Sequence, residues 1–258
     1  MTPGIDAAAL SVLQHKRIYF GHQSVGANII DGVRDLCCDY PQIMLNVVES
    51  CHPDAFAAPA LGHSRAGRNH EPRTKIDAFS DILGAGLGNK VDIALLKFCY
   101  VDVTEDSDVA GLFEYYQRVM AQLAMAYPRT LLVHVTLPVT VMPSLVRRIL
   151  GSLRRRHNRA AHDNLARAQY NRLLAQTYAG KAPVFDLAAI ESTTASGRAL
   201  RYNLHGREFR TLVPSYSSDG RHLSETGRRV VASEFLRFLA KTAMNQTIPV
   251  AHADMAHV

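Results

Sequence analysis

Apolar residues along this chain occur in short runs that are separated by segments with helical periodicity. The short runs predict β-strands at residues 16–20, 43–48, 91–98, 130–135 and 183–186. Apolar side chains at every third or fourth position predict helices at residues 24–39, 109–126, 163–178 and after Ser224. Because parallel strands are joined by crossover helices, this alternation predicts a three-layer α/β fold with a doubly wound, mainly parallel sheet.

Two long segments interrupt the alternation. Residues 50–74 are expected to form a loop, and their three histidines fit no compact metal-ligand spacing. Residues 139–162 combine apolar residues at helical spacing with six arginines. This segment is predicted to be an inserted basic helix that forms a lid, with Arg147 as a candidate contact for an anionic substrate. A solvated charged face and a membrane-surface helix are the alternatives.

The segment Ile18–Asn28 is a candidate for chemistry. It is predicted to be a short strand, a tight turn and the first turn of a helix, with Ser24 at the junction. Unpaired backbone N–H groups and the positive end of the helix dipole lie at such a junction. They can stabilise the oxyanion of an acyl intermediate. Alternatively, Ser24 is only an N-cap residue.

A second candidate lies near the other end of the chain, before the terminal helix. His222 can serve as the base that activates a serine, and Asp219, three residues earlier, can hold the histidine ring in one tautomer. The alternative is a surface turn in which neither residue acts on a substrate.

Together these residues give the chain a resemblance to the SGNH (GDSL-type) hydrolases, over the stretch from Phe20 to about Leu239. The resemblance implies that Ser24 is the nucleophile, His222 the base and Asp219 the residue that orients it. The family's Gly-Asp-Ser motif is replaced here by Gly21-His22-Gln23-Ser24, with one additional residue.

The resemblance also implies an oxyanion hole. The backbone N–H groups of Ser24 and Gly67 are its candidate donors, with the side chain of Asn69 as a third. After the central strand the family has Gly-x-Asn-Asp, whereas this chain has Cys99-Tyr100-Val101-Asp102, in which a valine replaces the donor asparagine. Candidate substrate contacts are Gln23, Tyr100 and Asp102.

The function predicted from these features is hydrolysis of a carboxylic ester by a Ser-His-Asp triad. The expected substrate is a small-molecule, glycan or carrier-bound acyl ester, and neither a cofactor nor a metal is expected. An O-acyltransferase that uses the same acyl-serine is one alternative. A catalytically inactive binding protein with the SGNH fold is another.

Composition adds few constraints. The 258 residues, of which 47% are hydrophobic, fit a single domain over 1–258, and residues 247–258 are expected to be a flexible tail. The net charge of +6 suits an anionic partner, but no nucleic-acid reader motif is present, so nucleic acid is not expected. The four cysteines fit neither a disulfide framework nor a zinc site. With no secretory signal or membrane span evident, the predicted location is cytoplasmic.

Overall fold

The central feature of the fold is a six-stranded parallel sheet with the order β2-β3-β1-β4-β5-β6. The computed structural model describes residues 7–142 and 151–246, with the backbone alone at residues 7, 8 and 151–158. The strands of the sheet are β1 Arg17–His22, β2 Val47–Glu49, β3 Ala60–Arg65, β4 Ile93–Leu96, β5 Leu131–Val135 and β6 Val184–Phe185. A separate antiparallel hairpin consists of β7 Arg201–Leu204 and β8 Arg207–Arg210.

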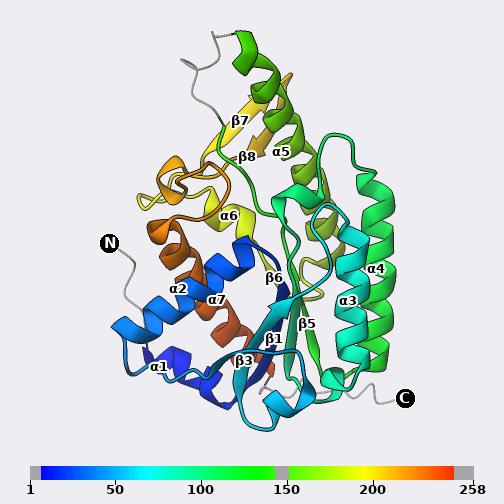
Figure 1. Cartoon of the computed structure of the whole chain (residues 1–258), viewed down its shortest axis with the longest axis vertical. Helices are drawn as coiled ribbons and strands as arrows, with labels where there is room; N and C mark the ends of the chain where they lie inside the picture. The colour runs from blue at the N-terminus through cyan, green and yellow to red at the C-terminus, as the bar shows by residue number, and fades with distance from the viewer. Residues whose placement is uncertain (1–6, 143–150, 247–258) are drawn as a thin grey trace, which may run out of the picture.

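Helices cover both faces of the sheet, so the predicted three-layer α/β fold is confirmed (Figure 1). One face carries α1 Ala7–Leu10, α2 Val25–Asp39, α6 Leu187–Glu191 and α7 Glu225–Gln246, and the other carries α3 Pro72–Gly84, α4 Val109–Ala126 and α5 Gly151–Tyr178. Short 3-10 turns are η1 Ser11–His15, η2 Pro53–Phe56, η3 Leu87–Asn89, η4 Tyr100–Asp102 and η6 Pro214–Tyr216. Alternate side chains of β1 enter two apolar cores, with Phe20 in one and Tyr19 in the other. No helix in the described ranges is long and apolar enough to span a bilayer.

The segment 50–74 was expected to be a loop, and this prediction is wrong. It contains the interior strand β3, and α3 begins within it. The strand carries polar side chains whose partners lie on neighbouring elements: Ser64 Oγ is 2.7 Å from the hydroxyl oxygen of Tyr19. Because these partners satisfy the polar groups, the strand is stable in the sheet without an apolar run. The strand predicted at 43–48 is likewise shifted, since β2 begins at Val47.

The helix predicted at 163–178 starts earlier than expected. It is the second part of α5, which begins at Gly151 and so includes the end of the predicted insertion at 139–162. Residues 143–150, which include Arg147, lie outside the described residues, and so does the predicted tail at 247–258. The lid, the Arg147 contact and the tail therefore stay predictions.

The topology brings three loops to one point. The strand order reverses at β1, which pairs with β3 on one side and β4 on the other. In open parallel sheets, ligands bind beyond the carboxyl ends of the strands at such a reversal. The loops that follow β1, β3 and β4 meet there, and Ser24 lies in the first of them.

Helices α2 and α7 connect this edge to the distant His222 segment. Ser24 directly precedes α2, and α7 begins three residues after His222. The two helices pack closely because Gly32 has no side chain: a Cβ at this position would lie 2.4 Å from the carbonyl oxygen of Arg228. Next to this contact, Arg228 Nε donates to Asp35 Oδ2 at 2.7 Å. Packing of α2 against α7 thus fixes the relative position of Ser24 and His222.

We expect Gly32→Ala to lower the free energy of unfolding by about 1–3 kcal/mol, because the added methyl group has no space against the backbone of α7. Urea titration followed by circular dichroism measures this change. Gly84→Ala is the matched control, since a Cβ at Gly84 would meet nothing within 4 Å. Equal free energies of unfolding for the two variants would contradict the conclusion that close packing of α2 against α7 requires a glycine at position 32.

Candidate active site

Ser24 lies where β1 ends and α2 begins. Its hydroxyl does not cap the helix. Instead, Ser24 Oγ lies 3.3 Å from the Sγ atom of Cys99, a buried residue. Cys99 lies in the loop that follows β4, the strand next to β1. The alternative in which the Ser24 side chain only caps the helix is therefore wrong. Its hydroxyl has the thiol of Cys99 as its partner, and a thiol forms only weak hydrogen bonds.

Asp219 and His222 form a hydrogen-bonded pair. His222 Nδ1 lies 2.7 Å from Asp219 Oδ2, and the backbone N–H of His222 donates to Asp219 Oδ1 at 2.7 Å. Desolvation acts to raise the pKa of Asp219, but hydrogen bonds from the His222 ring and from nearby backbone groups outweigh it and lower the pKa well below its usual range. An ionised carboxylate on Nδ1 leaves Nε2 of a neutral His222 as the proton acceptor.

The His222 segment packs next to the start of α2. The backbone N–H of Leu223 donates to Asn28 Oδ1 at 3.3 Å, one helical turn beyond Ser24. His222 Nε2 lies 3.5 Å from the hydroxyl oxygen of Tyr100. In the described residues no hydrogen bond joins Ser24 Oγ directly to His222. The serine faces Cys99 and the histidine faces Tyr100, the next residue along the chain.

The backbone around Gly67 is arranged by its neighbours. Gly67 has a φ of +59°, and a Cβ here would lie 2.4 Å from the backbone nitrogen of Lys75, so only glycine fits this turn. Gln23 Nε2 donates to the carbonyl oxygen of Gly67 at 2.7 Å. Gln23 was predicted to contact substrate, but its amide donates to this backbone instead. Within the described ranges, the N–H groups of Ser24 and Gly67 donate to no other protein group.

A buried ion pair ties this turn to the loop after β4. Lys75 Nζ lies 2.5 Å from Asp102 Oδ2, and both side chains are fully buried. Asp102 also accepts the backbone N–H groups of Cys99 at 2.6 Å and of His70 at 3.1 Å. Asp102 was predicted to contact substrate; its carboxylate is buried and hydrogen-bonded to these protein groups, and the substrate contact stays a prediction.

The same lysine orients Asn69. Lys75 Nζ donates to Asn69 Oδ1 at 2.8 Å, which leaves the amide NH₂ group of this exposed side chain available as a donor. A donor at this position could replace the asparagine that the chain lacks at Val101. Lys75 itself was missed from the sequence because the helix that carries it was not predicted.

Two further buried ionisable residues, Lys97 and Glu191, lie near Cys99. Lys97 Nζ is 3.8 Å from Cys99 Sγ, and burial lowers the pKa of this lysine. Glu191 accepts the backbone N–H of Val139 at 2.9 Å, and burial raises the pKa of its carboxyl group to about 8. Lys97 was not among the predicted site residues, although a lysine within the otherwise apolar run 91–98 is unusual and could have identified it.

Two histidines also occupy the interior. His22 Nε2 lies 3.1 Å from His63 Nδ1, and burial lowers the pKa of His22 to about 3, so His22 is neutral at pH 7. Burial lowers the pKa of His63 as well. The other histidines of the 50–74 segment do not join them. Across residues 7–142 and 151–246, no group of three His, Cys, Asp or Glu side chains is arranged to hold a metal ion.

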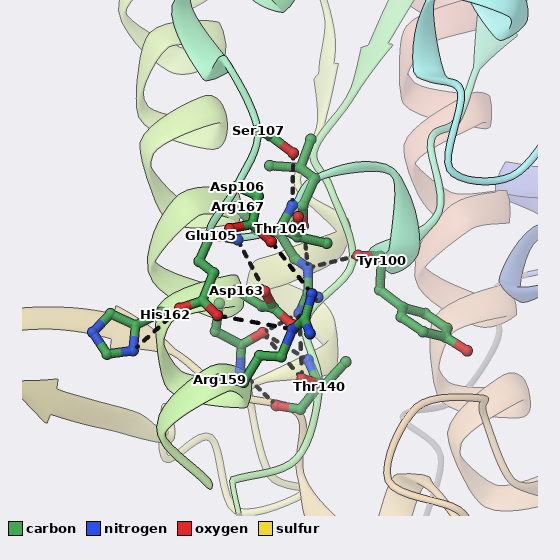
Figure 2. Close-up of polar contacts among 12 residues, drawn as sticks. Tyr100, Thr104, Glu105, Asp106, Ser107, Thr140, Arg159, His162, Asp163 and Arg167 are labelled. Carbon is green, nitrogen blue, oxygen red and sulfur yellow. Dashed lines mark hydrogen bonds and ion pairs between the residues drawn. The ribbon is translucent and has the colours of Figure 1, made fainter. Parts of the chain in front are cut away.

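A pocket with a volume of about 530 Å³ opens next to Tyr100. It lies between the loop after β4 and the amino-terminal half of α5, where Figure 2 shows Arg159 and Arg167 directed toward residues 104–107 and Tyr100. Its lining residues are His70, Tyr100, Val101, Thr104, Thr140, Arg159, Ala160, Asp163, Arg167 and Arg221. The predicted substrate contact Tyr100 therefore lies between this pocket and His222.

Comparison with known proteins identifies the fold. No family model and no curated protein matches the sequence. A solved structure of a proposed acylhydrolase from Bacteroides fragilis is similar, with a TM-score of 0.53 over 88% of this chain and 88% of that chain, at 16% identity. The chain shares the fold of this structure, a parallel α/β sheet with helices on both faces. A solved structure from Streptococcus pneumonia, described provisionally as a platelet activating factor, is also similar to this chain, with a TM-score of 0.51 over 89% of this chain and 86% of that chain, at 15% identity.

We expect Lys75→Met to lower the free energy of unfolding by about 3–5 kcal/mol, because it leaves the Asp102 carboxylate buried without its counter-ion. Adding Asp102→Asn to this variant removes the lone charge and should recover part of the loss. Chemical denaturation of the single and double variants measures both effects. Lys90→Met, at an exposed position, is the control; a Lys75→Met variant as stable as this control would contradict a structural role of the ion pair.

Proposed function

We propose that this chain is a serine hydrolase of the SGNH type that cleaves carboxylic esters. The observation that supports the proposal is the Asp219–His222 hydrogen bond, which lies just before α7, the helix that packs against the α2 helix that follows Ser24. In this reading Ser24 is the nucleophile, His222 the general base and Asp219 the residue that orients the base. The shared fold is consistent with this assignment but does not supply it, because one fold supports many activities.

The reaction begins with rotation of the Ser24 side chain away from Cys99 toward His222. His222 Nε2 accepts the Ser24 hydroxyl proton as Oγ attacks the ester carbonyl carbon. The free N–H groups of Ser24 and Gly67, with the amide of Asn69, stabilise the resulting oxyanion. The imidazolium then protonates the leaving alcohol. A water molecule, deprotonated by His222, hydrolyses the acyl-serine and releases the acid.

A fluorophosphonate probe tests the nucleophile directly. We expect it to label Ser24, as located by peptide mass spectrometry, because an activated serine attacks phosphorus as it attacks an ester. Hydrolysis of p-nitrophenyl acetate should fall on the order of 10⁴-fold or more in Ser24→Ala and in His222→Ala. Cys99→Ala is the matched control: labelling that persists in this variant excludes the thiol 3.3 Å away as the nucleophile.

A binding protein without catalysis is the second candidate. The observation that favours it is that Ser24 Oγ faces Cys99 and His222 Nε2 faces Tyr100 in the described structure, rather than each other. The same experiment separates the two functions. A folded protein that remains unlabelled at Ser24 between pH 6 and pH 9 and hydrolyses no ester would favour binding.

A further inference from the structure

The arginines that line the pocket beside Tyr100 differ in what they contact. Arg167 is almost fully buried, and its guanidinium donates to the backbone carbonyl oxygen of Tyr100 at 2.8 Å and to Asn164 Oδ1 at 2.7 Å. Asp163 Oδ2 lies 3.8 Å from the same group. Arg167 therefore holds α5 against the loop after β4 (Figure 2).

The positive charge of Arg159 is balanced by neighbouring carboxylates. Its guanidinium lies 3.3 Å from Asp106 Oδ2 and 3.8 Å from Glu105 Oε1 (Figure 2). Both carboxylates belong to the segment that joins η4 to α4. With two acidic partners, this arginine contributes little net charge to the pocket.

Arg221 is the exception. In the part of the chain that the structure describes, no carboxylate lies within ion-pair distance of its guanidinium, although the side chain lines the pocket. The nearest acidic residue along the chain, Asp219, is already engaged by His222 and by the backbone N–H of Arg221. Arg221 and Tyr100 line the same pocket. Burial raises the pKa of the Tyr100 phenol, and the positive charge of Arg221 opposes that rise.

The pocket thus places an uncompensated cation next to the candidate base. Arg221 is adjacent in sequence to His222, and the rings of His222 and Tyr100 pack edge to face with their centroids 5.5 Å apart. A guanidinium presents two parallel N–H groups, which match the two oxygens of a carboxylate. Arg221 and the buried Arg167 line the same pocket. Burial lowers the pKa of Arg167 and the like charge of Arg221 acts in the same direction, so an anion bound in the pocket would offset this repulsion.

We propose that Arg221 binds a carboxylate of the substrate in this pocket, so that the preferred ester carries a negative charge on the part of the molecule next to the reacting group. This inference rests on the proposed esterase function and narrows its substrate class. It makes Arg221 a specificity-determining residue, since it would distinguish charged esters from neutral esters of the same shape.

A matched pair of esters tests the proposal: 4-acetoxybenzoate, which is anionic, and 4-acetoxybenzyl alcohol, which is neutral. The measured quantity is the ratio of kcat/KM for the two esters, compared between variants so that their intrinsic reactivities cancel. We expect Arg221→Gln to lower this ratio about tenfold or more, because it removes a charge-assisted contact. Arg221→Lys should lower it less, since the charge remains without the fork geometry.

Arg129→Gln is the matched control. It is the same substitution at an exposed arginine next to the amino end of β5, at the opposite edge of the sheet. It should leave the ratio at the wild-type value, which separates a local contact from the change in net charge. An Arg221→Gln ratio equal to that of wild type, with the neutral ester still hydrolysed, would overturn the carboxylate site and leave the esterase function intact.

If neither ester is hydrolysed, the carboxylate site is tested by measuring ligand binding instead of turnover. Calorimetric titration with the amide analogues 4-acetamidobenzoate and 4-acetamidobenzyl alcohol requires no turnover. Tighter binding of the anionic analogue by wild type, lost in Arg221→Gln and kept in Arg129→Gln, would support the carboxylate site although the esterase function had failed. Equal binding of the two analogues by wild type would overturn the site.

Discussion

The Lys75–Asp102 ion pair is the interaction on which the candidate site depends most. Both groups are fully buried, so each loses its hydration at a cost of about several kcal/mol. The cost is offset because Asp102 also accepts the N–H groups of Cys99 and His70, and Lys75 donates to Asn69. A replacement by apolar residues could stabilise the fold equally well, but it would not connect these two loops. The pair therefore determines where the loops after β3 and β4 lie.

This connection explains why some predictions from sequence succeeded. The strands near 16–20, 91–98 and 130–135 and the helices at 24–39 and 109–126 were found because their apolar spacing is local information. The Asp219–His222 pairing was predicted for the same reason: the residues are three apart, and one turn brings them together. Its link to Ser24, nearly 200 residues earlier in the chain, came only from a resemblance.

The failures have the opposite cause. Ser64 and His63 made β3 look like a loop, because their partners Tyr19 and His22 are about 40 residues away in sequence. Asp102 was named as a candidate substrate contact because it matches the family motif, and its buried counter-ion Lys75 could not be foreseen, since that residue lies 27 positions earlier in a helix that was not predicted. Polar residues that are satisfied by distant partners cannot be distinguished from functional ones by spacing alone.

The same reasoning applies to the positive charge of the chain. Six arginines in the segment 139–162 suggested an anion-binding helix, yet of these only Arg159 has a described side chain, and two carboxylates compensate it. Arg167, further along α5, already donates its hydrogen bonds to backbone and amide oxygens of the protein. The number of basic residues is therefore a poor guide to where an anion binds. A guanidinium attracts a ligand most strongly where the fold gives it no acidic partner, and within the pocket this condition is met at Arg221.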